Sequence, residues 1–199
     1  PARTEQTRGI YWMDMGANTQ GEYPKLKAQM FPVPCMQCED PPCVKVCPVG
    51  ATYKTDEGIT AQVYDRCIGC RYCQSACPYT RRYFNWSAPV WDESELSALN
   101  PDVPTRPAGV IEKCNFCQHR IRNAKEQARA DERKLGNSDL VHLTACAQAC
   151  PARAITFGDL SDPTSDVSRL HQSPRATRLL EELGTRPRVV YLRETKWTE

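Results

Sequence analysis

The stretch "CIGCRYCQSACPYTRRYFNW", from Cys67 to Trp86, places four cysteines within eleven residues and follows the last of them with proline. The last two cysteines and the proline form the pattern C-x3-C-P. Two other segments contain the same pattern: "CVKVCPVGA" at 43–51 and "CAQACPARAI" at 146–155. This is an internal repeat of a loop built around closely spaced thiols. Such a repeat predicts metal binding, and the open question is whether each run holds one centre or shares its cysteines with another.

The composition narrows the kind of centre. The chain has 199 residues, twelve cysteines, three histidines and a net charge of +2, which does not favour nucleic-acid binding. No apolar run is long enough to span a membrane, and the start "PARTEQTRG" lacks the apolar core of a secretory signal. Disulfides are disfavoured because pairs separated by two residues rarely form structural bridges. Zinc also uses C-x2-C pairs, but zinc ribbons do not need C-x3-C-P.

The spacing of the quoted stretch, C-x2-C-x2-C-x3-C-P, is that of bacterial [4Fe-4S] ferredoxins, in which the fourth cysteine ligates the other cluster of a pair. The group before it has the spacing C-x2-C-x4-C-x3-C-P. We therefore expect the fourth cysteines to be exchanged between two clusters. Cluster one would be held by Cys35, Cys38, Cys43 and Cys77. Cluster two would be held by Cys67, Cys70, Cys73 and Cys47.

The remaining four cysteines are less regular. Cys114, Cys117 and Cys146 are expected to hold three corners of a third cluster. Under the exchange rule Cys150 belongs to a different cluster, and no fourth group is visible to complete either site. Cys150 is therefore assigned either to cluster three or to a fourth cluster.

Three segments carry local structural signals. The segment 51–65, "ATYKTDEGITAQVYD", alternates around a turn at Asp56–Gly58 and predicts a β-hairpin. The charged segment 118–134 predicts a helix, either solvated or used to dock a partner subunit. Near the C-terminus, Ser173 as N-cap, Pro174 at the first helical position and Gly184 as a stop predict a short helix before the strand "RVVYL". The proline-rich segment 100–107 is expected to be a linker.

The cysteine groups, together with "RRYFNW", "KCNFCQHRI" and "LGTRPRVVYL", resemble the iron-sulfur subunits of the molybdopterin oxidoreductases. Dimethyl sulfoxide and polysulfide reductases are examples, and the iron-sulfur part of alternative complex III is similar. The matching motifs run in the same order from Pro34 to Leu192. In that family another cysteine group normally precedes "RGIYW" (8–12 here), so we expect a further N-terminal piece with four cysteines. The presence of Cys70 favours a full cube over a [3Fe-4S] centre at its site.

The resemblance implies an α+β fold of tandem bacterial-ferredoxin-like (βαβ) cluster-binding modules, with loop-rich insertions and a C-terminal helix–strand extension. The expected divisions are 1–34, completing the outer module; 35–99, the central two-cluster module; 100–159, the third cysteine group with a helical insertion; and 160–199, the C-terminal extension. At least three [4Fe-4S] clusters are expected, and four in the complete subunit.

The implied function is electron transfer between a molybdopterin-type catalytic subunit and an integral membrane quinone-interacting subunit, with a cytochrome c subunit as a further possible partner. The chain would associate with the membrane through these subunits, on the periplasmic face or alternatively the cytoplasmic one. No catalytic residues are assigned, because no dinucleotide fingerprint, P-loop or nucleophile–base set is present. The alternative is a regulatory or nucleic-acid-associated protein with structural clusters.

Several residues near the cysteines have two interpretations. Arg71, Arg81 and Arg82 would either raise a cluster's potential or face carboxylates of a partner. The aromatic residues are interpreted as packing that keeps water from the clusters rather than as electron relays: Tyr72, Tyr79, Tyr83, Phe84, Trp86 and Phe116. His119, His142 and His171 lack ligand spacing and are expected at the surface.

Overall fold

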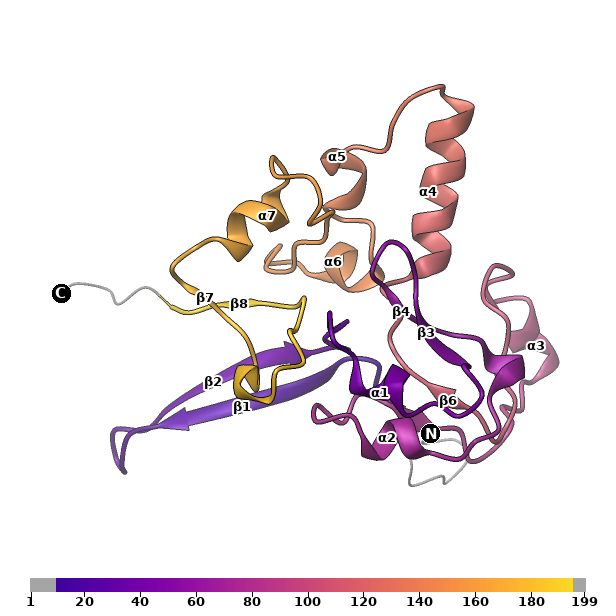
Figure 1. Cartoon of the computed structure of the whole chain (residues 1–199), viewed down its shortest axis with the longest axis horizontal. Coiled ribbons are helices and arrows are strands. Elements are labelled where there is room, and N and C mark those ends of the chain that lie inside the picture. The colour runs from indigo at the N-terminus through magenta and orange to yellow at the C-terminus, as the bar shows by residue number, and fades with distance from the viewer. Residues whose placement is uncertain (1–9, 195–199) are drawn as a thin grey trace. The chain divides into compact units, whose positions relative to one another are not determined.

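The computed structural model describes residues 10–194, which divide into two compact units between Asn115 and Phe116. The described elements are short helices and antiparallel strand pairs, which together make an α+β chain (Figure 1). Within residues 10–194 the strands form four two-stranded sheets and no larger one. No helix in this part of the chain is long and apolar enough to cross a membrane.

The first unit begins with a hairpin of β1 (Asp14–Gln20) and β2 (Lys27–Val33), in which Asp14 is opposite Val33. Gly16 lies opposite Phe31, and a Cβ on Gly16 would approach the Phe31 ring to 2.6 Å. The aromatic ring therefore occupies the space beside the glycine. The sequence reasoning did not predict this hairpin, because its strands are largely exposed on both faces and lack alternation.

Two short cysteine-bearing helices follow. Helix α1 (Pro42–Lys45) starts with proline at its first position, where no backbone N–H is needed. Helix α2 (Tyr72–Ser75) starts after Arg71, which has a left-handed backbone with φ of 61°. Between them, β3 (Thr52–Lys54) and β4 (Thr60–Gln62) form an antiparallel hairpin, which confirms the prediction for 51–65.

The rest of the first unit supports these loops. A 3-10 turn, η2 (Tyr64–Arg66), precedes Cys67. Strand β5 (Tyr83–Phe84) pairs with β6 (Ile111–Glu112), and the long connection between them contains helix α3 (Glu93–Leu96). Residues 97–110 hold no helix or strand, in agreement with the linker expected at 100–107.

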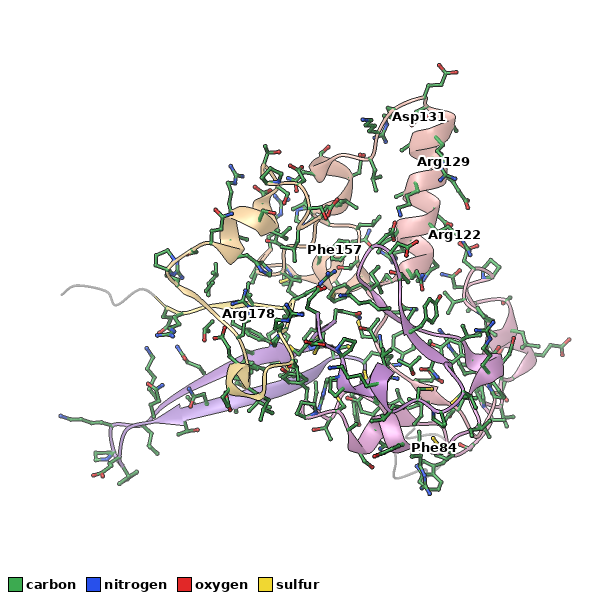
Figure 2. All side chains as sticks on the ribbon, viewed as in Figure 1. Phe84, Arg122, Arg129, Asp131, Phe157 and Arg178 are labelled. Carbon is green, nitrogen blue, oxygen red and sulfur yellow. The ribbon has the colours of Figure 1, made fainter. Side chains whose placement is uncertain are left out.

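The second unit is led by α4 (Gln118–Ala130), which confirms the helix expected there, although it ends before Lys134. Ile121 and Ala128, seven residues apart, are its buried positions, whereas Arg122 and Arg129 are exposed and extend away from the helix (Figure 2). Shorter helices follow: α5 (Asn137–Leu140), α6 (Ala145–Ala149) and α7 (Asp166–His171).

The predicted helix at 173–184 is wrong. Ala176–Thr177 form strand β7, which pairs with β8 (Tyr191–Leu192), and only a 3-10 turn, η3 (Glu181–Leu183), lies in the remainder. Leu180 has a left-handed backbone with φ of 50°, which interrupts any helix. The stop at Gly184 is present, with φ of 67°. The helical part of the C-terminal region is α7 instead.

Candidate iron-sulfur centres

The first pocket is formed by the loop after β2, helix α1 and the loop after α2. Four cysteines line it: Cys35, Cys38, Cys43 and Cys77. Three come from the first cysteine group, and the fourth comes from the end of the second group. The wall is completed by Met36, by prolines next to α1 and after Cys77, and by Tyr79, which is 7% exposed. Apolar walls of this kind limit the access of water.

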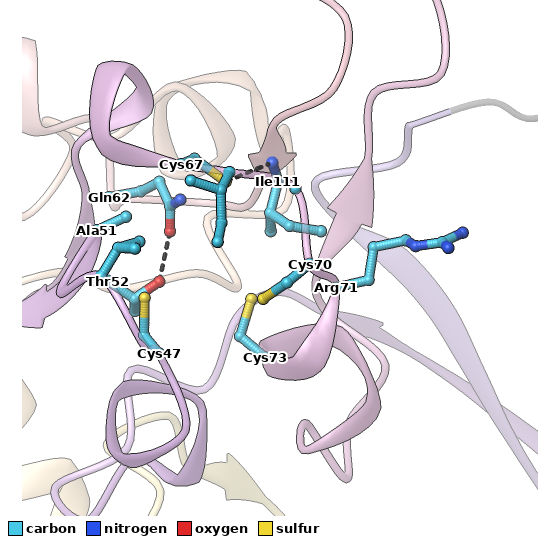
Figure 3. Close-up of a pocket in the computed structure, with 12 residues that line it drawn as sticks. Cys47, Ala51, Thr52, Gln62, Cys67, Cys70, Arg71, Cys73 and Ile111 are labelled. Carbon is cyan, nitrogen blue, oxygen red and sulfur yellow. Dashed lines mark hydrogen bonds between the residues drawn. The ribbon is translucent and has the colours of Figure 1, made fainter.

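The second pocket has the reciprocal composition. Cys67, Cys70 and Cys73 line it together with Cys47, and the side chains of Cys47, Cys70 and Cys73 extend into the pocket (Figure 3). Ile111 and Ala51 contribute apolar wall, and the Cys67 sulfur accepts a hydrogen bond from the Ile111 backbone at 3.4 Å. Each pocket is thus lined by three cysteines of one group and one of the other.

The two pockets adjoin each other. Cys43 of the first pocket and Cys73 of the second lie in the same buried cluster with Ile111, and each is less than 10% exposed. The short helices α1 and α2, which carry these two cysteines, also contact each other. The apolar core of the first unit therefore lies between two groups of four cysteines.

Burial has a clear effect on the thiols. Desolvation raises the pKa of Cys43 and of Cys73, and the Arg82 guanidinium opposes the rise in both. Burial also acts to raise the pKa of Cys47, but backbone hydrogen bonds, among them one from Thr52, hold it below its ordinary value. Buried cysteines become ligands by losing their protons, so occupancy of the pockets couples to proton release.

A buried hydroxyl in the first pocket has no hydrogen-bond partner. This hydroxyl provides a test of whether an iron-sulfur cluster fits the pocket. Thr60 lines that pocket, is 1% exposed, and its Oγ1 has no hydrogen-bond partner. A buried hydroxyl without a partner is costly, and a thiolate-ligated cluster is an anion whose sulfurs accept hydrogen bonds. The donor set, four thiolates and a free hydroxyl, fits such a cluster.

Two buried cationic side chains also favour an anionic cluster in this region. Arg82 is 2% exposed and its Nη2 donates to the Cys43 sulfur at 3.0 Å. Lys113 is 1% exposed, and its Nζ donates to the carbonyl of Cys114 at 2.7 Å. Among residues 10–194 neither side chain forms an ion pair with a carboxylate. Buried charges ordinarily require a counter-charge, which an anionic cluster supplies. No three His, Cys, Asp or Glu side chains in that range are grouped to hold a single metal ion.

The remaining cysteines fall in both units, Cys114 in the first and the other three in the second. In the first, the carbonyl of Cys114 accepts from Gln37 Nε2 at 2.9 Å, which fixes it to the loop between Cys35 and Cys38. In the second, the Cys117 sulfur accepts from the backbone of Ala145 at 3.4 Å, and α6 carries Cys146.

Cys150 ends helix α6. Its sulfur accepts a hydrogen bond from the Ala154 backbone at 3.3 Å.

Sequence reasoning missed some of these residues. Gln37, Thr60 and Lys113 were not singled out, although Gln37 and Lys113 are polar residues within or next to a C-x2-C pair. The aromatic residues are divided: Tyr79 is buried, whereas Tyr72 and Trp86 are 60% and 52% exposed. His142 is exposed, and His171 is half-buried, with a pKa lowered by burial. The Arg8–Gly9 part of "RGIYW" lies outside the described residues.

Comparison with known proteins agrees with this geometry. Residues 26–99, which include all eight cysteines of the two pockets, match the family described as 4Fe-4S dicluster domain. The iron-sulfur cluster-binding subunit of a menaquinone reductase from Nitratidesulfovibrio vulgaris is 48% identical over 99% of this chain and 78% of its own length. The arsenate respiratory reductase iron-sulfur subunit of Shewanella is 37% identical over 93% of this chain and 84% of its own length.

A protein of Halobacterium salinarum that carries the name of a dimethyl sulfoxide reductase iron-sulfur subunit is 42% identical over 86% of this chain. The chain spans 60% of that relative's length. The shared cysteine pattern, the dicluster match and the near-complete coverage agree with one another. The chain belongs to the [4Fe-4S] iron-sulfur subunits of the molybdopterin oxidoreductase family.

Proposed function

We propose that this chain conducts single electrons between a molybdopterin-type catalytic subunit and a membrane quinone or cytochrome module. The observation that carries the proposal is the pair of adjoining four-cysteine pockets, each completed by a cysteine of the other group. Exchange of ligands holds two clusters close together, as in two-cluster ferredoxins. Closely spaced clusters favour electron transfer over catalysis on a substrate.

We assign the ligands pocket by pocket. Cluster one is held by Cys35, Cys38, Cys43 and Cys77. Cluster two is held by Cys67, Cys70, Cys73 and Cys47. Cluster three is assigned to Cys114, Cys117 and Cys146, and Cys150 goes either to cluster three or to a fourth cluster. This makes at least three cubes, and four if the complete subunit carries another cysteine group.

The residues around the pockets would support redox chemistry by limiting water and by donating hydrogen bonds to the cysteine sulfurs. A [4Fe-4S] cube accepts and releases one electron with little rearrangement. Tyr79, Met36 and Ile111 limit water at the pockets, which lowers the local dielectric constant. The backbone of Ile111, like that of Arg81 toward Cys77, donates to a cysteine sulfur and so stabilises the thiolate.

The finer architecture is also a proposal. The eight pocket cysteines, all within 35–99, support a central ferredoxin-like module, with 1–34 completing an outer module, 100–159 carrying the third cysteine group, and 160–199 as an extension. The partners and the location are proposed by analogy with relatives named as subunits of menaquinone and arsenate reductases. On this basis the chain is held at the membrane by partner subunits, on the periplasmic or the cytoplasmic face.

The experiment is an anaerobic iron determination combined with electron paramagnetic resonance of the stepwise-reduced protein. About twelve irons per chain would indicate three cubes and about sixteen would indicate four. Magnetic interaction between reduced clusters one and two is expected because their pockets adjoin. Isolated centres that stay redox-silent would instead support the regulatory alternative and refute electron conduction.

A further inference from the structure

Arg82 is buried without a carboxylate partner. It is 2% exposed, and its Nη1 donates to Thr52 Oγ1 at 3.0 Å and to Gln62 Oε1 at 3.1 Å. Both acceptors are neutral groups. Its remaining hydrogen bond, from Nη2, goes to the Cys43 sulfur at 3.0 Å. Within residues 10–194 the positive charge is therefore left to be balanced by whatever the cysteines bind.

The position of this guanidinium relates it to both pockets. Arg82 itself lines the first pocket, where its Nη2 contacts a sulfur. Thr52 and Gln62, which accept its other hydrogen bonds, line the second pocket, and they are joined to each other by a 2.6 Å hydrogen bond (Figure 3). The guanidinium thus lies in the wall shared by the two groups of four cysteines.

We propose that Arg82 is a shared electrostatic bridge that raises the reduction potentials of clusters one and two together. The inference rests on the ligand assignment proposed above. Reduction adds one electron to a cube, with no bond or proton rearrangement required. A buried positive charge favours the more negative state, and it acts strongly because little water screens it. Hydrogen bonds to cluster sulfurs raise the potential in the same direction.

The sharing matters for a conducting chain. A cation beside one cluster alone would raise the potential of that cluster and make it a trap for the electron. A cation in the common wall raises both potentials, so the step between the two clusters stays small. Arg82 therefore adjusts the reduction potentials of both clusters through its charge and has no direct role in chemistry on a substrate.

Two neighbouring positions provide matched controls. Arg71 also lines the second pocket, but it is exposed, and its guanidinium lies over the rings of Phe84 and Trp86. Removing its charge should shift only cluster two, and weakly, because solvent screens it. Thr60 lines only the first pocket. Replacing it with valine removes one donor without changing charge and should shift cluster one alone.

The test is a redox titration of the complete protein, followed by electron paramagnetic resonance, for wild type, Arg82→Gln, Arg82→Lys, Arg71→Gln and Thr60→Val. For Arg82→Gln we expect the reduction equilibrium constants of both clusters to fall at least tenfold, which is about 59 mV for a one-electron couple. Arg82→Lys keeps the charge and should shift both less. Unchanged potentials, or a shift of one cluster alone, in a fully loaded Arg82→Gln protein would overturn the proposal.

A second measurement covers the case in which Arg82→Gln does not load its clusters. In wild-type protein labelled with 15N-arginine, the reduced cluster-one signal should show a nitrogen hyperfine coupling that disappears in Arg82→Lys. If that coupling is absent from the wild type, the proposal is overturned. A wild-type protein without iron would instead refute the proposed function itself, so the two failures are distinguishable.

Discussion

Arg81 Nη2 donates to the Asp14 carboxylate at 3.0 Å and thereby joins strand β1 to the loop that follows Cys77. The same arginine donates to the carbonyls of Tyr79 at 2.7 Å and Val33 at 3.4 Å. Its side chain is 10% exposed, whereas that of Asp14 is 51% exposed. One side chain thus fastens both strands of the N-terminal hairpin to the wall of the first pocket.

Asp14→Asn should loosen this attachment. The carboxylate is half exposed, so its loss should change global stability little, but the β1 amides should exchange faster. A backbone hydrogen bond from Met15, and then Arg81, lower the pKa of Asp14, so the attachment is complete at neutral pH and is lost as the pH falls below that pKa. Hydrogen exchange by mass spectrometry would measure the exchange rates of the β1 amides in wild type and Asp14→Asn. Asp56→Asn, on an exposed turn, is the control, and equal exchange in the two variants would contradict the prediction.

Cys77→Ser should remove the cluster held by Cys35, Cys38 and Cys43, because Cys77 lines their pocket and not that of its own group. Cys47→Ser should have the reciprocal effect on cluster two. Electron paramagnetic resonance of each variant, compared with Cys35→Ser and Cys67→Ser, identifies the cluster that is lost. If Cys77→Ser lost the same signal as Cys67→Ser, the exchanged assignment would be wrong.

Gly69→Ala should disrupt the second pocket. Gly69 has φ of +68°, and a Cβ there would lie 2.3 Å from the carbonyl oxygen of Gly109, a backbone atom that cannot move aside freely. We expect a large fall in the iron content of cluster two. Gly50→Ala is the matched control, since Gly50 has φ of +60° but open space around it. It should cost only about 1 kcal/mol of backbone strain and keep both clusters.

Gln37→Leu should destabilise the first unit. Gln37 is 1% exposed; its Oε1 accepts from the Thr60 backbone at 2.8 Å, and its Nε2 donates to Cys114 O. Leucine would leave the buried Thr60 N–H unpaired, at about 1 to 3 kcal/mol. Anaerobic urea unfolding would measure the loss. Gln127→Leu, at an exposed site on α4, should change stability by less than about 0.5 kcal/mol, and a similar effect of both variants would count against the buried role.

His171 should make the second unit sensitive to mild acid. Burial, and then the charge of Arg178, lower the pKa of His171 from 6.5. The unfolded chain therefore binds the proton more readily, so stability is complete above pH 6.5 and falls as the pH drops below it toward the lowered value. His171→Gln should flatten this slope in unfolding measured between pH 5 and 7. An unchanged slope in His171→Gln would assign the effect to other groups.

Local signals predicted some elements well and others poorly. The hairpin β3–β4 was predictable because its alternation and the turn at Gly58 are local, and α4 because its residues favour helix. The segment from Ser173 has equally good helix signals, yet Ala176–Thr177 pair with strand β8 fourteen to sixteen residues later. Such pairing depends on distant residues and overrides local propensity. The β1–β2 hairpin gave no signal, because exposed strands need no alternation.

The sequence by itself determined the chemistry: two four-cysteine runs, each closing with C-x3-C-P, specify iron-sulfur binding, since ligand loops are local and their spacing can be read along the chain. Only the tertiary structure decided what surrounds the sulfurs. Arg82 contacts Cys43 across 39 positions and Gln37 contacts Cys114 across 77. Burial and hydrogen bonding between such distant residues exist only after folding, and they are the factors that set the charge and water around each centre.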